Sequence, residues 1–410
     1  MVRGLRKYTI ARARIVACAI VGAMLATGPV CAEQESFGAW LEGIRAEAAS
    51  KGLAGGAIDE ALMRARHVDR IVELDRRQPE LTQTFWRYLD ARITSERIAT
   101  GQANFHAYEP LLNRIYQRYG VQPRVLVALW GLESDYGRSQ GDFGVISSLA
   151  TLAFDSRRSA FFKQQLFAAL ELIQRSDVPA DVLGSWAGAI GQPQFMPTSL
   201  RDYAVDFDGD GRRDLLGGLP DVFASAANYL AMSGWDKHAS WGHEVWLVPE
   251  QFDYFETGLQ VERPVSEWQR LGVRDITGGN LPDSDMKASV LLPAGAKGPA
   301  FIVYRNFRAI LRWNNSVLYA LAVGHLSDRI GGGGPLACPR PLEEVPLSRY
   351  DVVEIQSMLT GLGFEPGAPD GIIGENTRRA VRMFQKSVEL PADGYPDAGL
   401  LEQLRTRFVN

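Results

Sequence analysis

The sequence predicts a mainly helical α+β fold with a small β subdomain, followed by a C-terminal module of three short helices. Apolar residues recur at helical spacing through residues 36–120 and in several later segments. Short β-like runs are confined to residues 243–310. A glycine- and proline-rich linker at residues 331–349 sets the final part of the 410-residue chain apart from the rest.

Each predicted helix has its own apolar pattern. Within residues 37–44 the large apolar side chains fall at i, i+3, i+4 and i+7, along one face of a helix. Residues 123–132 are almost continuously apolar and begin with proline, which the first turn of a helix tolerates. The pattern is helical again over residues 159–173 and 316–330, whereas residues 179–235 alternate glycine-rich turns with helices.

The β-like runs are residues 244–248, 288–292 and 301–304. They are rich in β-branched and aromatic residues, and turn signals separate them. Together they predict a small sheet.

The first 32 residues are typical of an export signal. Basic side chains end at Arg14, an apolar stretch follows at residues 15–25, and small residues precede position 33. The apolar stretch is too short to span about 30 Å of hydrocarbon comfortably. A retained membrane anchor is the alternative. A lipoprotein modified at Cys31 is less favoured, because residues 28–30 lack the usual leucine and small residue.

Charge and cysteine content restrict the function further. Residues 1–32 hold five basic residues and no acid, so the remainder has 39 basic and 48 acidic residues. An acidic chain is a poor nucleic-acid binder, since such binding depends on neutralising phosphates. Beyond the predicted signal only Cys338 remains, so no intrachain disulfide is expected. No other segment of the sequence is apolar enough to span a membrane.

Glu133 is the carboxylate best placed for chemistry. It lies at the end of the apolar helix, and on a helix its i−3 and i−4 neighbours are Trp130 and Leu129. Loss of hydration among such side chains raises the pKa of a carboxyl group, which suits a general acid near neutral pH. Aromatic surroundings also suit the apolar faces of a sugar. The alternative is a helix-terminal glutamate satisfied by a backbone amide.

Glycosidases generally use two carboxylates, either about 5 Å or about 6.5–9.5 Å apart. Asp135, Asp142 and Asp155 are the candidates for a second one, but none shares the apolar setting of Glu133. A mechanism with one carboxylate is possible when the substrate supplies its own nucleophile, such as an N-acetyl group.

Three ordered motifs resemble the lytic murein transglycosylase B family: residues 128–137 (Ala-Leu-Trp-Gly-Leu-Glu-Ser-Asp-Tyr-Gly), residues 149–158 and the glycine-rich residues 185–199. Similar segments follow in the same order at Asp206, at residues 226–235 and at residues 311–316, so the likeness covers residues 36–330. The resemblance implies a lysozyme-like catalytic domain over residues 33–330.

The resemblance also implies an activity. Such an enzyme is periplasmic and cleaves the MurNAc–GlcNAc β-1,4 bond of peptidoglycan without water, leaving a 1,6-anhydro-MurNAc end. Glu133 would protonate the glycosidic oxygen and then deprotonate the MurNAc 6-hydroxyl, while the 2-acetamido group stabilises the positive intermediate. No cofactor is required for this chemistry.

Nine residues match family positions around the substrate: Tyr88, Arg157, Arg158, Ser185, Gln194, Tyr229, Trp313, Asn314 and Tyr319. The two arginines would hold acidic groups of the peptide stem, or else form a solvated helix start. Trp313 replaces the tyrosine that is more common in the family, which keeps the aromatic plane but puts a hydrogen-bonding role in doubt.

The segment that begins at Asp206 fits the first nine positions of an EF-hand loop, with acids at positions 1, 3, 5 and 9 and glycine at 6. Position 12 is Gly217 instead of glutamate. In the lytic murein transglycosylase B family, the corresponding loop is similarly lengthened and is closed by an aspartate. We expect a structural Ca²⁺ or another hard cation, the alternative being an empty acidic turn. The expected ligands are Asp206, Asp208, Asp210, the Arg212 carbonyl and Asp221.

Residues 350–410 resemble the peptidoglycan-binding domain 1. The Asp-Gly-x-x-Gly-x-x-Thr pattern is specific to that domain, and its Asp370, Gly374 and Thr377 are the candidate ligand contacts. Asn376 or Thr377 is expected to cap the second helix. The expected core residues are Ile355, Leu359, Val381 and Phe384.

Two alternatives to the transglycosylase remain. A hydrolytic muramidase would act on the same glycan strands but would need a second carboxylate to activate water. A non-catalytic peptidoglycan-binding scaffold would keep the C-terminal module and tolerate loss of Glu133.

Overall fold

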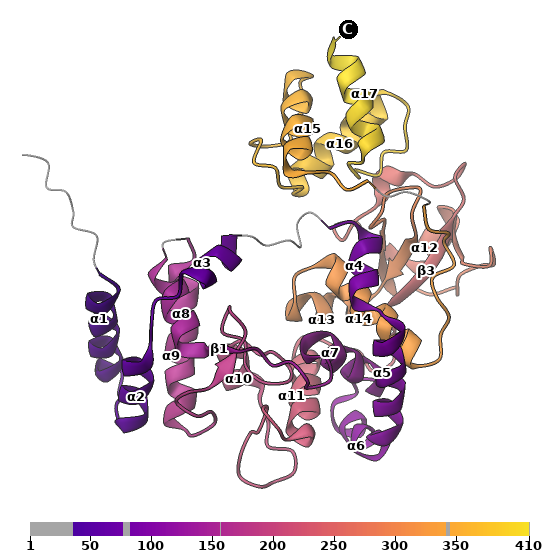
Figure 1. Cartoon of the computed structure of the whole chain (residues 1–410). Helices are drawn as coiled ribbons and strands as arrows, with labels where there is room; N and C mark the ends of the chain where they lie inside the picture. Colours follow the sequence, from indigo (N-terminus) through magenta and orange to yellow (C-terminus); the bar gives the residue numbers. More distant parts are fainter. Residues whose placement is uncertain (1–35, 77–82, 156, 342–344, 410) are drawn as a thin grey trace, which may run out of the picture.

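The computed structural model describes residues 36–76, 83–155, 157–341 and 345–409. It is mainly helical, with one small sheet, and the C-terminal module lies at one end of the molecule (Figure 1). The predicted export signal falls outside the described residues. Within the described part of the chain, no helix combines the length and apolarity needed to cross a bilayer.

One helical layer has its own hydrophobic core, in which side chains of α8 and α9 pack against the N-terminal helices. Asp69–Arg76, for instance, contributes Ile71, which is fully buried. The elements of this helical layer are α1 (Phe37–Ser50), α2 (Gly56–Arg64), α3 (Asp69–Arg76), α8 (Val145–Phe154), α9 (Ser159–Gln174), α10 (Pro197–Tyr203) and the paired two-residue strands β1 (Phe143–Gly144) and β2 (Leu183–Gly184). The helices predicted in residues 37–44 and 159–173 are thus confirmed as parts of α1 and α9.

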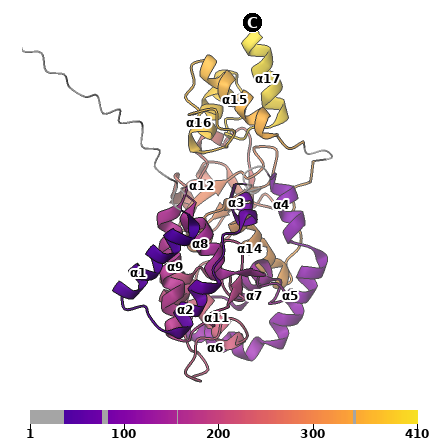
Figure 2. The same cartoon turned by 60° about the vertical axis from the view of Figure 1, so that its left-hand side comes forward.

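A second core is built around α7 (Pro123–Ser134), in which every residue from Val125 to Gly131 is buried. This explains the continuous apolar run, because a helix surrounded by others has no polar face. Figure 2 shows α7 inside the bundle, near α5 and α14. The surrounding helices are α4 (Phe85–Arg92), α5 (Ser95–Ala107), α6 (Glu109–Tyr119), α11 (Leu219–Met232), α13 (Arg305–Trp313) and α14 (Val317–Ile330).

The β subdomain is a five-stranded antiparallel sheet in the order β4-β6-β7-β3-β5. Its core includes Trp268, which is fully buried and whose indole N–H donates to the Ala288 carbonyl at 2.9 Å. The three predicted β runs are confirmed as β3, β6 and β7. The elements are β3 (Gly242–Leu247), η2 (Tyr254–Glu256), β4 (Arg263–Pro264), α12 (Val265–Arg270), β5 (Val273–Asp275), β6 (Lys287–Leu291) and β7 (Ala300–Val303).

The C-terminal module consists of α15 (Arg349–Gly361), α16 (Glu375–Ser387) and α17 (Ala398–Val409) around a core that contains the four predicted residues. The predicted cap of α16 is wrong. Its N-cap is Gly374, and Thr377 lies inside the helix, where its buried hydroxyl bonds to the Pro366 carbonyl at 3.2 Å.

The module is docked on the β subdomain rather than hanging from the linker. The Asp393 carboxylate accepts a hydrogen bond from the Ala296 amide at 2.7 Å, and Arg382 donates to Thr257 at 3.3 Å. The linker is fastened as well, because the amide of Cys338 donates to Glu244 at 2.8 Å. These contacts give the module a defined orientation on the body.

The buried His325 in α14 makes folding stability dependent on pH. Burial, aided by the positive charge of Arg329, lowers the pKa of His325 to about 4. Between the unfolded value of about 6.5 and the folded value, only the unfolded chain takes up the proton. The free energy of unfolding should therefore fall by about 3 kcal/mol as the pH drops from 7 to 4.

Chemical denaturation at pH 7 and pH 4.5 measures this effect. His325→Gln should remove most of the difference, whereas His67→Gln, at a partly exposed position beside Asp69, should preserve it. An unchanged pH dependence in His325→Gln would contradict the account.

Candidate active site

Glu133 lies in the last turn of α7 and is half-buried. The helix stops abruptly, because Asp135 and Tyr136 both have left-handed backbones, with φ of 51° and 60°. Such residues cost roughly 1–3 kcal/mol each and persist only where the surroundings impose them. Here the Tyr136 hydroxyl donates to the Arg97 carbonyl at 2.6 Å, and Gly131 has no Cβ that would overlap the Tyr136 ring.

Two side chains, one from the end of α13 and one from the first turn of α14, hold the Glu133 carboxylate. The Trp313 indole N–H donates to Glu133 Oε1 at 2.7 Å, and the Tyr319 hydroxyl donates to the same oxygen. Ser316 caps α14 by accepting from the Tyr319 amide at 3.3 Å, which fixes the first turn of that helix. Hydrogen bonds to an ionised acceptor are about twice as strong as neutral ones, so this pair defines the carboxylate's position.

This contact corrects the expectation for Trp313. An indole lacks a hydroxyl but still has one N–H donor, and here that donor reaches the carboxylate. The indole N–H of Trp313 therefore makes a hydrogen bond at the position where the family more often has a tyrosine hydroxyl.

Tyr319 remains a donor at all physiological pH values. Burial raises its pKa well above the ordinary value of 10, and the nearby negative charge of Glu133 raises it further. Tyr88 and Arg92 also influence the pKa of Tyr319, with Tyr88 raising and Arg92 lowering it. Tyr88 is fully buried, with the Arg92 guanidinium 3.9 Å from its ring centroid, and contact of Tyr88 with substrate stays a prediction.

Aromatic rings extend the site beyond Trp313. The Trp313 ring centroid lies 5.1 Å from those of Tyr229 and Phe195. The Tyr229 hydroxyl donates to the Arg312 carbonyl at 2.6 Å, and burial raises its pKa. Tyr229 and Trp313 are thus brought together as expected. Asn314 ends α13, where its amide donates to the Ile310 carbonyl at 3.0 Å.

The glycine-rich segment reaches this cluster through Phe195. Ser185 Oγ accepts from the Ala189 amide at 3.0 Å and thereby shapes the turn. Gln194 has a left-handed backbone, and its side-chain amide donates to the carbonyls of Gln140 and Gly191 at 3.0 and 2.8 Å. Both residues build the loop that carries Phe195 to the Trp313 ring.

Arg157 and Arg158 are held elsewhere. Both guanidinium groups pair with Asp75, a carboxylate only 5% exposed on α3. The sequence contained no signal for this partner. The observed role of the pair is to fix α3 beside α8 and α9, and binding of a peptide stem stays a prediction.

The candidates for a second carboxylate have other surroundings. Asp135 pairs with Arg138 at 2.8 Å and Arg97 at 3.4 Å, and Asp155 pairs with Arg76 at 3.1 Å. Asp142 lies exposed in the loop before β1. Glu133 differs from Asp135 and Asp155 in that the side chains donating to it, Trp313 and Tyr319, are uncharged.

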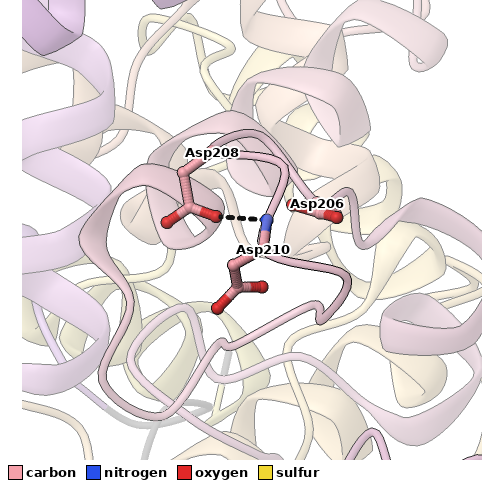
Figure 3. A group of neighbouring side chains, drawn as sticks. All are labelled: Asp206, Asp208 and Asp210. Carbon is pink, nitrogen blue, oxygen red and sulfur yellow. Dashed lines mark hydrogen bonds between the residues drawn. The ribbon is translucent and has the colours of Figure 1, made fainter.

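The acidic loop brings three of its aspartates together. One carboxylate oxygen each from Asp206, Asp208 and Asp210 lies within 4.8 Å of the other two, and Figure 3 shows the three side chains around one turn. Asp206 also accepts from the amides of Gly209 and Gly211 at 2.7 and 2.9 Å. Carboxylate oxygens gathered in this way suit a hard cation.

Asp221 does not join that cluster. It is buried at the start of α11, where its two oxygens accept from the amides of Phe207 and Asp214 at 2.7 and 2.9 Å. Burial raises the pKa of Asp221, and the charges of Asp208 and Asp206 raise it further. The backbone amide of Arg212 donates to the Asp210 carboxylate at 2.8 Å. Arg212 and Asp221 therefore both brace the loop.

The module's candidate residues surround Gln356, a buried side chain of α15. Its amide donates to Asp370 and to the Thr377 hydroxyl, both at 3.1 Å, and the bond from Gln356 lowers the pKa of Asp370. Gly374 is exposed at the start of α16. Asp370 and Thr377 thus shape their loop, and ligand contact stays a prediction.

Sequence reasoning missed Gln192, although it lies inside the recognised glycine-rich motif. Its side chain is buried, and its Oε1 accepts from the Trp130 indole at 2.7 Å. Only the fold reveals this contact, because the two residues are 62 positions apart.

Comparisons with known proteins match two parts of the chain to known families. Residues 36–328 match the family described as transglycosylase SLT domain, and residues 348–404 match the peptidoglycan binding domain. The chain is 32% identical over 286 residues to membrane-bound lytic murein transglycosylase B of Escherichia coli K12, which covers 67% of this chain and 77% of the relative.

Solved structures are also similar. SltB3 of Pseudomonas aeruginosa, in complex with NAG-anhNAM-pentapeptide, is 48% identical with a TM-score of 0.87, covering 90% of this chain and all of that one. The Escherichia coli lytic transglycosylase Slt35, in complex with calcium, is 29% identical with a TM-score of 0.63, covering 71% and 92%. The chain therefore belongs to the transglycosylase SLT domain family, as a lytic murein transglycosylase that acts on peptidoglycan and carries a C-terminal peptidoglycan binding domain.

Proposed function

We propose that this enzyme cleaves the MurNAc–GlcNAc β-1,4 bond without water, leaves 1,6-anhydro-MurNAc ends, and acts in the periplasm. The observation that carries the proposal is the Glu133 carboxylate held by Trp313 and Tyr319 at the end of a buried helix. The similar SltB3 was solved with a ligand that contains anhNAM, which supports an anhydro product.

One carboxylate performs both proton transfers in this mechanism. Protonated Glu133 gives its proton to the glycosidic oxygen as the C1–O4 bond breaks, and the 2-acetamido group stabilises the positive charge at C1. Ionised Glu133 then takes the proton of the MurNAc 6-hydroxyl as O6 bonds to C1. The carboxyl group ends as it began, so no water is consumed.

The two donors suit the ionised half of this cycle. Trp313 and Tyr319 both donate to Oε1, which stabilises the carboxylate after it has lost its proton. Because both bonds end on Oε1, together they fix the orientation of the carboxyl group.

Glu133→Gln should abolish turnover, because the amide keeps the shape but cannot cycle a proton. The expected loss is at least about 10²- to 10⁴-fold, measured as soluble fragments released from purified sacculi. Asp135→Asn is the matched control, since asparagine tolerates the left-handed backbone, and it should retain most activity. Near-normal release by Glu133→Gln would remove Glu133 from this role.

We further propose that the loop of Asp206, Asp208 and Asp210 binds Ca²⁺ in a structural role, with the Arg212 carbonyl as a further ligand. Asp221 would brace this loop through the amides of Phe207 and Asp214. The similar Slt35 was solved with calcium. Carboxylates that repel one another when the loop is empty would be neutralised by the ion, which stabilises the turn before α11.

Calcium at 10 mM should therefore raise the melting temperature by a few degrees. A dissociation constant of about 10⁻⁴–10⁻³ M corresponds to about 1–3 kcal/mol. Asp208→Asn should lose the response, whereas Asp214→Asn, outside the cluster, should melt earlier but still respond. Identical melting of the unmutated enzyme in calcium and in chelator would contradict an occupied site.

The C-terminal module is proposed to hold the enzyme on the wall. Its core is separate from those of the body, so truncation after Pro341 should leave the body folded. In a Glu133→Gln background, which prevents digestion, truncation should weaken sacculus binding about tenfold or more. With Glu133 present, cleavage of soluble glycan strands should persist. Equal binding with and without the module would rule out the anchoring role.

A further inference from the structure

The turn after Glu133 must be held in place, because three consecutive residues, Asp135 to Gly137, have left-handed backbones. Two hydrogen bonds within the turn support it: the Tyr136 amide donates to the Trp130 carbonyl at 3.2 Å, and the Gly137 amide donates to Ser134 Oγ at 3.1 Å. Both bonds lie within the same short segment. They do not fix the turn relative to the rest of the molecule.

Gln192 provides an external support on both sides of Glu133. Its Oε1 accepts from the Trp130 indole at 2.7 Å, three residues before Glu133. The same oxygen lies against Gly137, four residues after it, where a Cβ would overlap the Gln192 side chain. One buried amide group therefore touches the chain on either side of the proposed acid.

The other end of Gln192 is anchored in a rigid segment. Its Nε2 donates to the Leu216 carbonyl at 3.1 Å, and its backbone amide donates to the Leu215 carbonyl at 2.9 Å. The amide of Leu216 in turn bonds to Asp214 at 2.9 Å, and the Asp214 amide bonds to the buried Asp221. The acidic loop thus supplies the fixed point from which Gln192 reaches Trp130.

We propose that Gln192 is a positioning residue for Glu133: by holding Trp130 and Gly137 against the acidic loop, it sets the carboxylate where Trp313 and Tyr319 can bind it. This inference rests on the proposed role of Glu133. Gln192 has no part in proton transfer, since it acts through the turn and through Trp130.

The chain offers a closely matched control at the other end of α7. Gln122, the N-cap residue, accepts from the Trp235 indole at 2.9 Å and donates to the Lys237 carbonyl at 3.1 Å. Gln122 caps α7 itself, whereas Gln192 reaches that helix from the glycine-rich segment, but each side chain accepts from an indole N–H and donates to a backbone carbonyl. Loss of Gln122 therefore reproduces the general destabilisation without disturbing the Glu133 turn.

The test uses the indole N–H of Trp313 as a reporter of the Glu133 carboxylate. The full-length enzyme has nine tryptophans, whose indole resonances can be followed by ¹⁵N NMR and assigned with Trp313→Phe and Trp130→Phe. In Gln192→Met, which removes both side-chain bonds, the Trp313 indole proton should move upfield because its bond to Glu133 weakens. In Gln122→Met it should stay in place, although both variants melt earlier.

Kinetics on soluble glycan strands give a second readout. Gln192→Met should lower kcat about ten- to hundredfold with KM within about twofold, as expected for a misplaced catalytic group. Trp130→Phe tests the same bond from its other end and applies equally if Gln192→Met does not fold. The double variant should be no slower than either single one, because a shared bond is lost only once.

An unmoved Trp313 resonance, an unchanged kcat, or multiplicative losses in the double variant would overturn the proposal. These outcomes differ from failure of the proposed function, which would show as an active Glu133→Gln enzyme whatever the state of Gln192.

Discussion

In the proposed mechanism Glu133 first gives up a proton and then accepts one, so its hydrogen-bond donors must hold the carboxyl group without locking it in the ionised form. Trp313 and Tyr319 meet this requirement through one oxygen of Glu133, and both are neutral groups. An arginine or lysine in their place would hold the carboxylate ionised and oppose its first step as an acid. Burial keeps the Tyr319 phenol protonated, so the donor survives the negative charge beside it.

The rest of the fold places these three side chains together. Helix α7 is buried on all sides and stops in a left-handed turn, which presents Glu133 at the boundary of two cores. Helices α13 and α14 bring the donors from far along the chain, and the glycine-rich segment places Phe195 against Trp313. The acidic loop and the arginine pair on Asp75 fix layers that surround the site.

Local pattern and motif order identified Glu133, the glycine-rich segment, the acidic loop and the module, because each depends on residues close together in sequence. Contacts between distant segments were beyond such reasoning. Trp130 and Leu129, the neighbours expected to desolvate Glu133, lie in the core beside α7. The side chains that donate to the Glu133 carboxylate come instead from α13 and α14, far along the chain. Arg157 and Arg158 are residues of a type that binds anions, and their pairing with the buried Asp75 could not be foreseen because Asp75 lies about 80 positions earlier in the chain. Tyr88 is fully buried, which its residue type did not reveal.

In the proposed mechanism one glutamate completes the reaction with a hydroxyl of the substrate instead of water. Digestion of sacculi in water enriched in ¹⁸O, followed by mass spectrometry of the released muropeptides, distinguishes the two nucleophiles. Attack by the substrate hydroxyl gives products that are one water lighter than reducing muropeptides and contain no ¹⁸O. Products that gain one ¹⁸O atom for each bond cleaved would show that water is the nucleophile.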